Sequence, residues 1–136
     1  METSSIIYTG GLRTKATHVR SGQEIITDAP LDNQGKGEAF SPTDLLATSL
    51  GNCMATIMGI NAGKNNFSID GMKLKVTKIM ESNPRRVSEI IVEFDMPENI
   101  YSEEQKKMLK IAAVNCPVAK SLHPELKQTV IFNYSA

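Results

Sequence analysis

The sequence predicts an α+β protein in which antiparallel sheets surround one long, buried central helix. Two observations lead to this fold class. Short segments rich in β-branched residues lie in two groups, over residues 5–28 and 69–96. Between them, apolar residues recur at helical spacing over residues 41–66 and cover nearly every side of the helix, which is typical of a buried helix. At 136 residues, 40% of them apolar, the chain has the size of a single domain, 1–136.

The first group of segments predicts a three-stranded meander followed by a long loop. The strands are expected at residues 5–10, 14–20 and 23–28, with Ser21-Gly22 as a tight hairpin turn. The Gly- and Pro-rich loop over residues 29–42 is long for a compact domain, and such loops are often functional. It is either a lid or a solvated connection.

The central helix has recognisable ends. Ser41 or Thr43 is a suitable cap, Pro42 suits a first turn, and Gly63 with the asparagines after it ends the helix. Two further strands, a helix capped by Ser102, a short helix starting at Pro117 and a last strand complete the order βββ-α-ββ-αα-β. These later elements are expected at residues 69–81, 86–96, 102–114, 117–122 and 127–135.

Composition excludes several classes of protein. Fifteen basic and fifteen acidic residues cancel, so the chain lacks the basic excess of a nucleic-acid-binding protein. The N-terminus lacks the pattern of a secretory signal, and polar residues interrupt the central apolar stretch too often for a membrane span. We therefore expect a cytoplasmic protein with no membrane partner. The predicted strands are few and lie in two groups, so one copy of the chain leaves apolar surface exposed. A second copy would cover this surface, which predicts a homodimer.

The two cysteines are the candidate reactive groups. In the cytoplasm a cysteine pair is two free thiols, a redox couple or part of a metal site. A metal site is not expected, because His18 and His123 do not lie near a cysteine at ligand-like spacing. Cys53 is either a small core residue or a reactive thiol. Gly51 is a poor residue for a helix interior, so its place just before Cys53 suggests close backbone approach or local polarity.

Cys116 stands before Pro117, at or next to a predicted helix N-terminus. Free backbone N–H groups there are expected to favour the thiolate. Alternatively, Cys116 only ends the preceding helix. If the two thiols meet, they form a two-thiol peroxidase, in which one thiolate is oxidised to a sulfenic acid and the other resolves it to a disulfide. Such a site also needs a cation beside the attacking sulfur and a carboxylate that orients the cation.

Two motifs together resemble the OsmC/Ohr family of thiol-dependent hydroperoxide reductases, with residues 41–55 reading SPTDLLATSLGNCMA and residues 115–122 reading NCPVAKSL. The resemblance implies an intertwined homodimer with two active sites at the interface. It makes Cys53 the peroxidatic thiol and Cys116 the resolving thiol of an antioxidant peroxidase that reduces organic hydroperoxides. It further implies reduction of the disulfide by a lipoylated protein or a small dithiol, and no metal, haem or flavin.

The same resemblance assigns the charged groups. The family's arginine follows a Gly-Gly pair, which points to Arg13, with Arg20 as the second choice. In the family, a glutamate directly after the helix-starting proline pairs with this arginine. Thr43 stands at that place here, and the nearest acid, Asp44, comes one residue later and points about 100° away around the helix. Asp44 or Glu38 is then the carboxylate partner, and the pattern is closest to a divergent OsmC-like branch.

Two alternatives remain open from the sequence. Met54 and Met58, one turn apart beside Cys53, either fill the core or line an apolar substrate pocket together with Thr43. The alternative function is a non-catalytic or weakly catalytic dimeric binding protein for a small apolar ligand, which the missing glutamate at position 43 favours.

Overall fold

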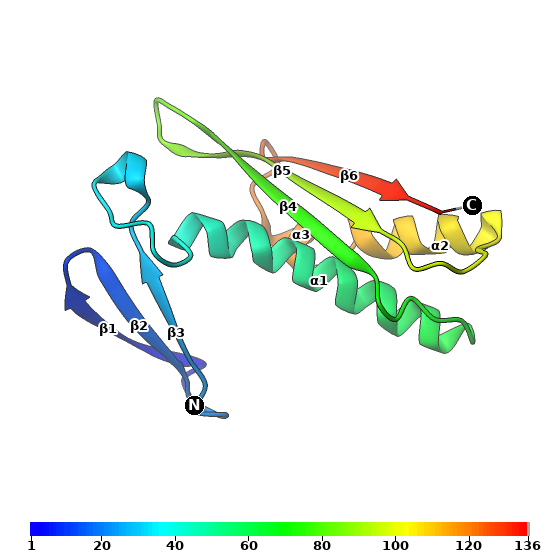
Figure 1. The fold of residues 1–136 in the computed structure, drawn as a ribbon, viewed down its shortest axis with the longest axis horizontal. Coiled ribbons are helices and arrows are strands. Elements are labelled where there is room, and N and C mark those ends of the chain that lie inside the picture. The colour runs from blue at the N-terminus through cyan, green and yellow to red at the C-terminus, as the bar shows by residue number, and fades with distance from the viewer. Residues whose placement is uncertain (136) are drawn as a thin grey trace. The chain divides into compact units, whose positions relative to one another are not determined.

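The computed structural model describes residues 1–135, which form two compact units. The first unit is Met1–Leu46 and the second begins at Ala47. Helix α1 (Pro42–Lys64) begins in the first unit and continues through the second (Figure 1). The α+β class and the order of the elements expected from the sequence are confirmed. One element was not expected, the 3-10 helix η1 (Leu31–Asn33) in the long loop.

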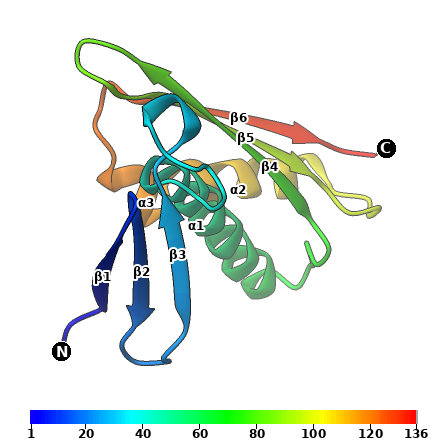
Figure 2. The ribbon, with the colours of Figure 1, turned by 60° about the vertical axis from the view of Figure 1, so that its left-hand side comes forward.

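The first unit is an antiparallel meander of three strands (Figure 2), β1 (Ser4–Gly10), β2 (Arg13–His18) and β3 (Glu24–Asp28). Gly10, Gly11 and Leu12 all have positive φ, which turns the chain sharply between β1 and β2. This turn makes Arg13 the first residue of β2.

The turn between β2 and β3 is wider than the sequence predicts. The His18 N–H donates to the Gln23 carbonyl at 2.8 Å, so residues 19–22 all belong to the turn. A two-residue turn at Ser21-Gly22 would pair Arg13 with Pro30, whereas the wider turn pairs it with Asp28. The width of this turn therefore decides which side chain faces Arg13.

The loop after β3 folds back on its own start. The Gly35 N–H donates to the Pro30 carbonyl at 2.9 Å, and the Gly37 N–H donates to the Ala29 carbonyl at 3.2 Å. A Cβ atom on Gly35 would lie 1.7 Å from the Ala29 carbonyl oxygen, so only glycine fits. This close packing returns Glu38 to the end of β3, where its N–H donates to an Asp28 carboxylate oxygen at 3.1 Å.

The second unit contains a three-stranded sheet in the order β4-β5-β6, with β4 and β5 antiparallel and β5 and β6 parallel. The strands and the remaining helices are β4 (Lys73–Glu81), β5 (Arg86–Asp95), α2 (Glu103–Val114), α3 (Pro117–Ser121) and β6 (Lys127–Asn133). The prediction that β4 begins at residue 69 was wrong. Gly71 has a φ of 88° and the Met72 N–H bonds back to the Ile69 carbonyl, which makes a turn there.

Helices α1 and α2 lie on the same face of this sheet (Figures 1 and 2) and share its hydrophobic core. Leu50 of α1, Phe94 of β5 and Leu109 of α2 are fully buried there. Leu46 and Ile60 of α1 are about half exposed in one copy of the chain. By length and composition, α1 is the one helix of residues 1–135 that could cross a membrane, a test that core helices of soluble proteins also pass.

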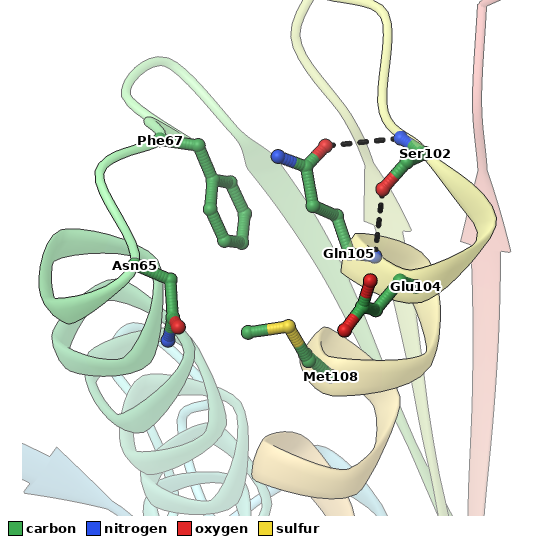
Figure 3. A pocket seen from close by; sticks show the side chains of 6 residues that line it. All are labelled: Asn65, Phe67, Ser102, Glu104, Gln105 and Met108. Carbon is green, nitrogen blue, oxygen red and sulfur yellow. Dashed lines mark hydrogen bonds between the residues drawn. The ribbon is translucent and has the colours of Figure 1, made fainter.

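Helix α2 begins with the reciprocal cap that its sequence favours. The Ser102 hydroxyl accepts from the Gln105 N–H at 3.1 Å, and the Gln105 amide oxygen accepts from the Ser102 N–H at 2.9 Å (Figure 3). A small pocket of about 220 Å³ lies beside this cap. The far side of the pocket comes from Asn65 and Phe67, which follow α1.

Candidate active site

The two thiols lie together in the second unit. Cys53 is on α1 and partly exposed, and Cys116 is the N-cap residue of α3 and fully buried. Both are free, and Cys53 lies close enough to Cys116 to raise the pKa of its thiol. Two consecutive amides at the start of α3 also point at the sulfurs, from Val118 to Cys53 Sγ at 3.5 Å and from Ala119 to Cys116 Sγ at 3.4 Å. The tertiary fold thus brings together two residues that are far apart in the sequence.

Local sequence explains how Cys116 is held. Its N–H donates to the Ala113 carbonyl at the end of α2, and Pro117, which has no N–H, starts α3. From β6, the Gln128 side-chain amide donates to the Ala119 carbonyl at 3.0 Å. The thiol is therefore fixed between two helices and tied to the sheet.

The expectation that the Cys116 environment favours a thiolate was wrong. Burial raises the pKa of the Cys116 thiol above its ordinary value. The Ala119 N–H acts in the opposite direction but is outweighed, and the hydrogen bond and charge of Cys53 raise the pKa further. Desolvation in a fully buried position outweighs the weak contacts of the Ala119 and Val118 amides, so Cys116 is a neutral thiol at physiological pH.

A second cluster of charged residues lies in the first unit. Arg13 donates to both carboxylate oxygens of Asp28, from Nε at 2.7 Å and from a terminal nitrogen at 2.8 Å. The same terminal nitrogen donates to Glu38 at 3.0 Å. Asp28 is 1% exposed, whereas Glu38 is largely exposed. The structure therefore places Arg13 beside Glu38, and its bidentate partner is Asp28.

These contacts fix the charges of the pair. The Arg13 hydrogen bond, more than any other cause, lowers the pKa of the Asp28 carboxyl, although burial acts in the opposite direction. The same bond is the main reason that the pKa of Arg13 is raised. Both groups are therefore charged across the physiological range, which keeps the guanidinium oriented.

Sequence reasoning missed Asp28, the principal partner of Arg13. Asp28 could have been found from its place at the end of β3, the strand that pairs with β2. Its pairing with Arg13, however, depends on the turn between the two strands, which was predicted too narrow. Arg20, the second-choice arginine, is exposed in that turn.

The residues at the start of α1 take part in its cap. The Asp44 carboxylate accepts from the Ser41 N–H at 2.9 Å, and the Ser41 hydroxyl accepts from the Asp44 N–H at 3.0 Å. The Thr43 hydroxyl lies 3.2 Å from the Ser41 hydroxyl. These hydrogen bonds give Asp44 and Thr43 a structural role at the helix start.

The other candidate residues have plain structural surroundings. Met54 and Met58 are fully buried in the core of the second unit, the packing alternative that the sequence left open. No group of three or more His, Cys, Asp or Glu side chains within residues 1–135 is placed to hold a metal ion.

Comparisons with known proteins place the chain in a family. The family model described as OsmC-like protein matches residues 35–130. A crystal structure from Psychrobacter arcticus 273-4, provisionally described as an osmotic stress induced and detoxification response protein, is similar to this chain. It shares 52% sequence identity with a TM-score of 0.94, over 98% of this chain and 96% of the other. None of the curated proteins compared with the sequence matches it.

More distant solved structures share the fold. An organic hydroperoxide resistance protein OsmC from Legionella pneumophila is 13% identical with a TM-score of 0.77, over 98% of each chain. A Vibrio cholerae protein is provisionally described as an organic hydroperoxide resistance protein with captopril bound in one of its active sites. It is 14% identical with a TM-score of 0.75, over 98% of this chain and 92% of the other. With its paired thiols and its match over residues 35–130, this chain belongs to the OsmC-like protein family.

Proposed function

We propose that this protein is a thiol peroxidase that reduces organic hydroperoxides with Cys53 and Cys116. The observation that carries the proposal is the pair of free thiols, one partly exposed and one buried, that two consecutive amides of α3 contact. The family supports it, since the relatives from Legionella pneumophila and Vibrio cholerae are described as organic hydroperoxide resistance proteins.

In the proposed reaction, the Cys53 thiolate attacks the terminal oxygen of the hydroperoxide. The O–O bond breaks, Cys53 becomes a sulfenic acid, and the alkoxide leaves with a proton as the alcohol. The Cys116 sulfur, on losing its proton, attacks the Cys53 sulfur and displaces hydroxide, which leaves as water. The products are an alcohol, a water molecule and a Cys53–Cys116 disulfide.

The surroundings of each thiol suit these roles. Cys53 is partly exposed, so a substrate can reach it, whereas Cys116 has no exposed surface. The raised pKa keeps Cys116 protonated until Cys53 has been oxidised. A neutral, buried thiol beside the attacking sulfur suits resolution better than attack.

Turnover needs an external reductant. We propose that a dithiol, either a lipoylated protein or a small dithiol, attacks the disulfide and leaves as its own cyclic disulfide. The cytoplasm, where thiols are kept reduced, is the expected location.

The role of Arg13 rests on the resemblance to the family. Held by Asp28 and Glu38, its guanidinium is fixed and charged, as a group that stabilises a thiolate must be. We propose that Arg13 stabilises the Cys53 thiolate. Asp28 then supplies the carboxylate that orients Arg13, in place of the glutamate that the family has where this chain has Thr43.

We also propose a homodimer with active sites at its interface. Ile6, Ile7 and Tyr8 of β1 are each at least 60% exposed, although they alternate between two faces of the sheet. A small sheet with apolar residues exposed on both faces favours a second copy of the chain as its cover.

A single-turnover assay with cumene hydroperoxide tests the thiol roles. Wild type is expected to consume about one equivalent of peroxide per chain and to form a Cys53–Cys116 disulfide, identified by peptide mass spectrometry. Cys53→Ser should lose consumption. Cys116→Ser should keep the first reaction and accumulate a sulfenic acid at Cys53 that dimedone traps.

Circular dichroism of both variants controls for folding, and Cys116→Ala is a second variant for the buried position. Full consumption by folded Cys53→Ser would contradict the proposal. So would an oxidised wild type without the disulfide. Unreactive thiols together with a stoichiometric apolar ligand in native mass spectra would support the binding protein instead.

The two candidate arginines form a matched pair of variants. Arg13→Met is expected to slow the first reaction about tenfold or more, because the thiolate loses its counter-charge. Arg20→Met removes the same charge from the exposed turn and should leave the rate unchanged. Equal effects of the two substitutions would exclude a specific role for Arg13.

A further inference from the structure

A groove in the second unit lies away from the thiols. It has a volume of about 480 Å³ and is formed by α2 together with the end of β6 and the residue after it. Its lining residues are Glu103, Lys106, Lys107, Lys110, Phe132 and Tyr134. Neither cysteine is among them, so the proposed peroxidase reaction does not account for this groove.

The floor of the groove is a rigid aromatic surface. Phe132 stacks on buried Phe94 with ring centroids 4.6 Å apart, and Tyr134 stacks on Phe132 at 6.2 Å. Tyr134 also meets Tyr101 edge to face at 5.7 Å. Because the Tyr134 hydroxyl is buried, the ring and not the hydroxyl lines the groove. This floor offers a flat apolar area that is ordered before any ligand binds.

The rim of the groove is basic. Lys106 lies with its ammonium 4.6 Å above the Tyr134 ring and 3.4 Å from Glu103, the one acid of the lining. Within residues 1–135, Lys107 and Lys110 have no carboxylate within 4 Å. Three lysines therefore face one glutamate that is already paired, and the rim has an excess of positive charge.

The acids of the neighbouring strands do not neutralise this rim. Glu93 and Asp95 both accept hydrogen bonds from Asn133, which alternates with Phe132 and Tyr134 along the chain. Successive residues of a strand point to opposite faces, so these carboxylates belong to the other face of the sheet. Glu104 lines the pocket on the other side of α2 (Figure 3).

We propose that this groove binds a small amphiphilic carboxylate, with its apolar body on the aromatic floor and its carboxylate between Lys107 and Lys110. The volume falls within the range of sites for small molecules, about 300–1,000 Å³. An apolar floor with a cationic rim is complementary to an anion joined to a hydrophobic body. A purely polar anion would make no apolar contact with the aromatic floor. A neutral lipid would leave the lysine ammonium groups without a counter-charge.

Binding of dodecanoate, kept below its micellar concentration and measured by isothermal titration calorimetry, tests the proposal. Dodecanoate should bind with one site per chain, and its affinity should fall as salt is added. Acetate, which has the charge without the chain, and dodecanol, which has the chain without the charge, should each bind at least tenfold more weakly.

The variants locate the site. The double variant Lys107→Gln/Lys110→Gln should weaken dodecanoate binding about tenfold, the effect of two exposed ion pairs. Lys64→Gln/Lys73→Gln removes two exposed lysines elsewhere in the same unit and should bind as wild type does. Cys53→Ser should also bind as wild type does, which separates this site from the peroxidase reaction.

Three results would overturn the proposal. The first is equal binding by the two double lysine variants. The second is equal affinity for dodecanol and dodecanoate, which would remove the role of charge. The third is a pair of results: free dodecanoate fails to bind, and the protein cosediments with phosphatidylglycerol vesicles unless it carries Lys107→Gln/Lys110→Gln. This pair would assign the basic rim to binding a membrane surface.

Discussion

At the scale of single residues, burial gives the two cysteines different chemistry. Cys116 is fully buried, and its pKa is raised above its ordinary value, mainly by desolvation. Iodoacetamide is therefore expected to label Cys53 first at neutral pH. Labelling of Cys116 should rise about tenfold per pH unit up to its pKa, because only the thiolate reacts. Peptide mass spectrometry after timed alkylation measures both rates. Earlier labelling of Cys116, or a rate that is flat between about pH 7 and 9, would contradict this assignment.

Asp28 is a charged residue buried in the first unit. Because Arg13 lowers its pKa in the folded protein, Asp28 stabilises the fold above its usual pKa of about 3.9. This stabilisation is lost as the pH falls through the lowered pKa. Asp28→Asn should lower the melting temperature at pH 7 and flatten the dependence of the melting temperature on pH below about 5.

Thermal melts followed by circular dichroism between about pH 3 and 7 measure this effect. Asp70→Asn, at an exposed aspartate of the second unit, is the matched control and should keep the wild-type profile. A melting temperature of Asp28→Asn that follows the wild-type curve throughout would show that the ion pair adds no stability.

At the scale of elements, Gly51 sets how closely α1 approaches its sheet. A Cβ atom there would lie 2.9 Å from Val76 Cγ2, whereas a Cβ on Gly59, also inside α1, would meet nothing within 4 Å. Ala has the same advantage in helix propensity at both interior positions, about 1 kcal/mol. Gly59→Ala should therefore gain stability, and Gly51→Ala should be less stable than Gly59→Ala by about 1–2 kcal/mol.

Urea denaturation measures this difference, and Val76→Ala tests its cause. In the Gly51→Ala background, Val76→Ala should cost less stability than it costs in wild type, because it relieves the crowding. Equal gains from alanine at the two glycines would mean that the helix can shift away from the sheet without cost.

The elements were predictable because their signals are local. The β-branched runs, the Ser102 cap and the Pro-initiated helices each depend on neighbouring residues, and their order is confirmed. The exceptions arose where a turn decided the outcome. The wide turn between β2 and β3 shifted the pairing of Arg13, and the turn at Gly71 shortened β4.

At the scale of the whole molecule, the residues of the proposed peroxidase lie in two compact units. Arg13, Asp28 and Glu38 belong to the first unit, and both thiols belong to the second. The sequence predicts a single domain, and we propose a homodimer. Thermal unfolding should then be one cooperative transition whose midpoint rises with protein concentration, because association stabilises the folded chain.

Calorimetry over a hundredfold range of concentration and light scattering test this prediction. Two separate transitions would mean that the units unfold independently. A midpoint that does not change with concentration, with a solution mass of 14.9 kDa, would exclude the dimer.

The sequence by itself determined the family, the class and order of the elements, and the two reactive thiols as candidates. The class and order of the elements and the candidate thiols follow from residue type and local spacing, and the family follows from the resemblance of two motifs. Tertiary structure alone decided that Cys53 and Cys116 lie close together, that Cys116 is a neutral thiol, and that Asp28 holds Arg13. Contacts between distant residues depend on turn width and strand register, and pKa shifts depend on burial. Neither is a property of a local stretch of sequence.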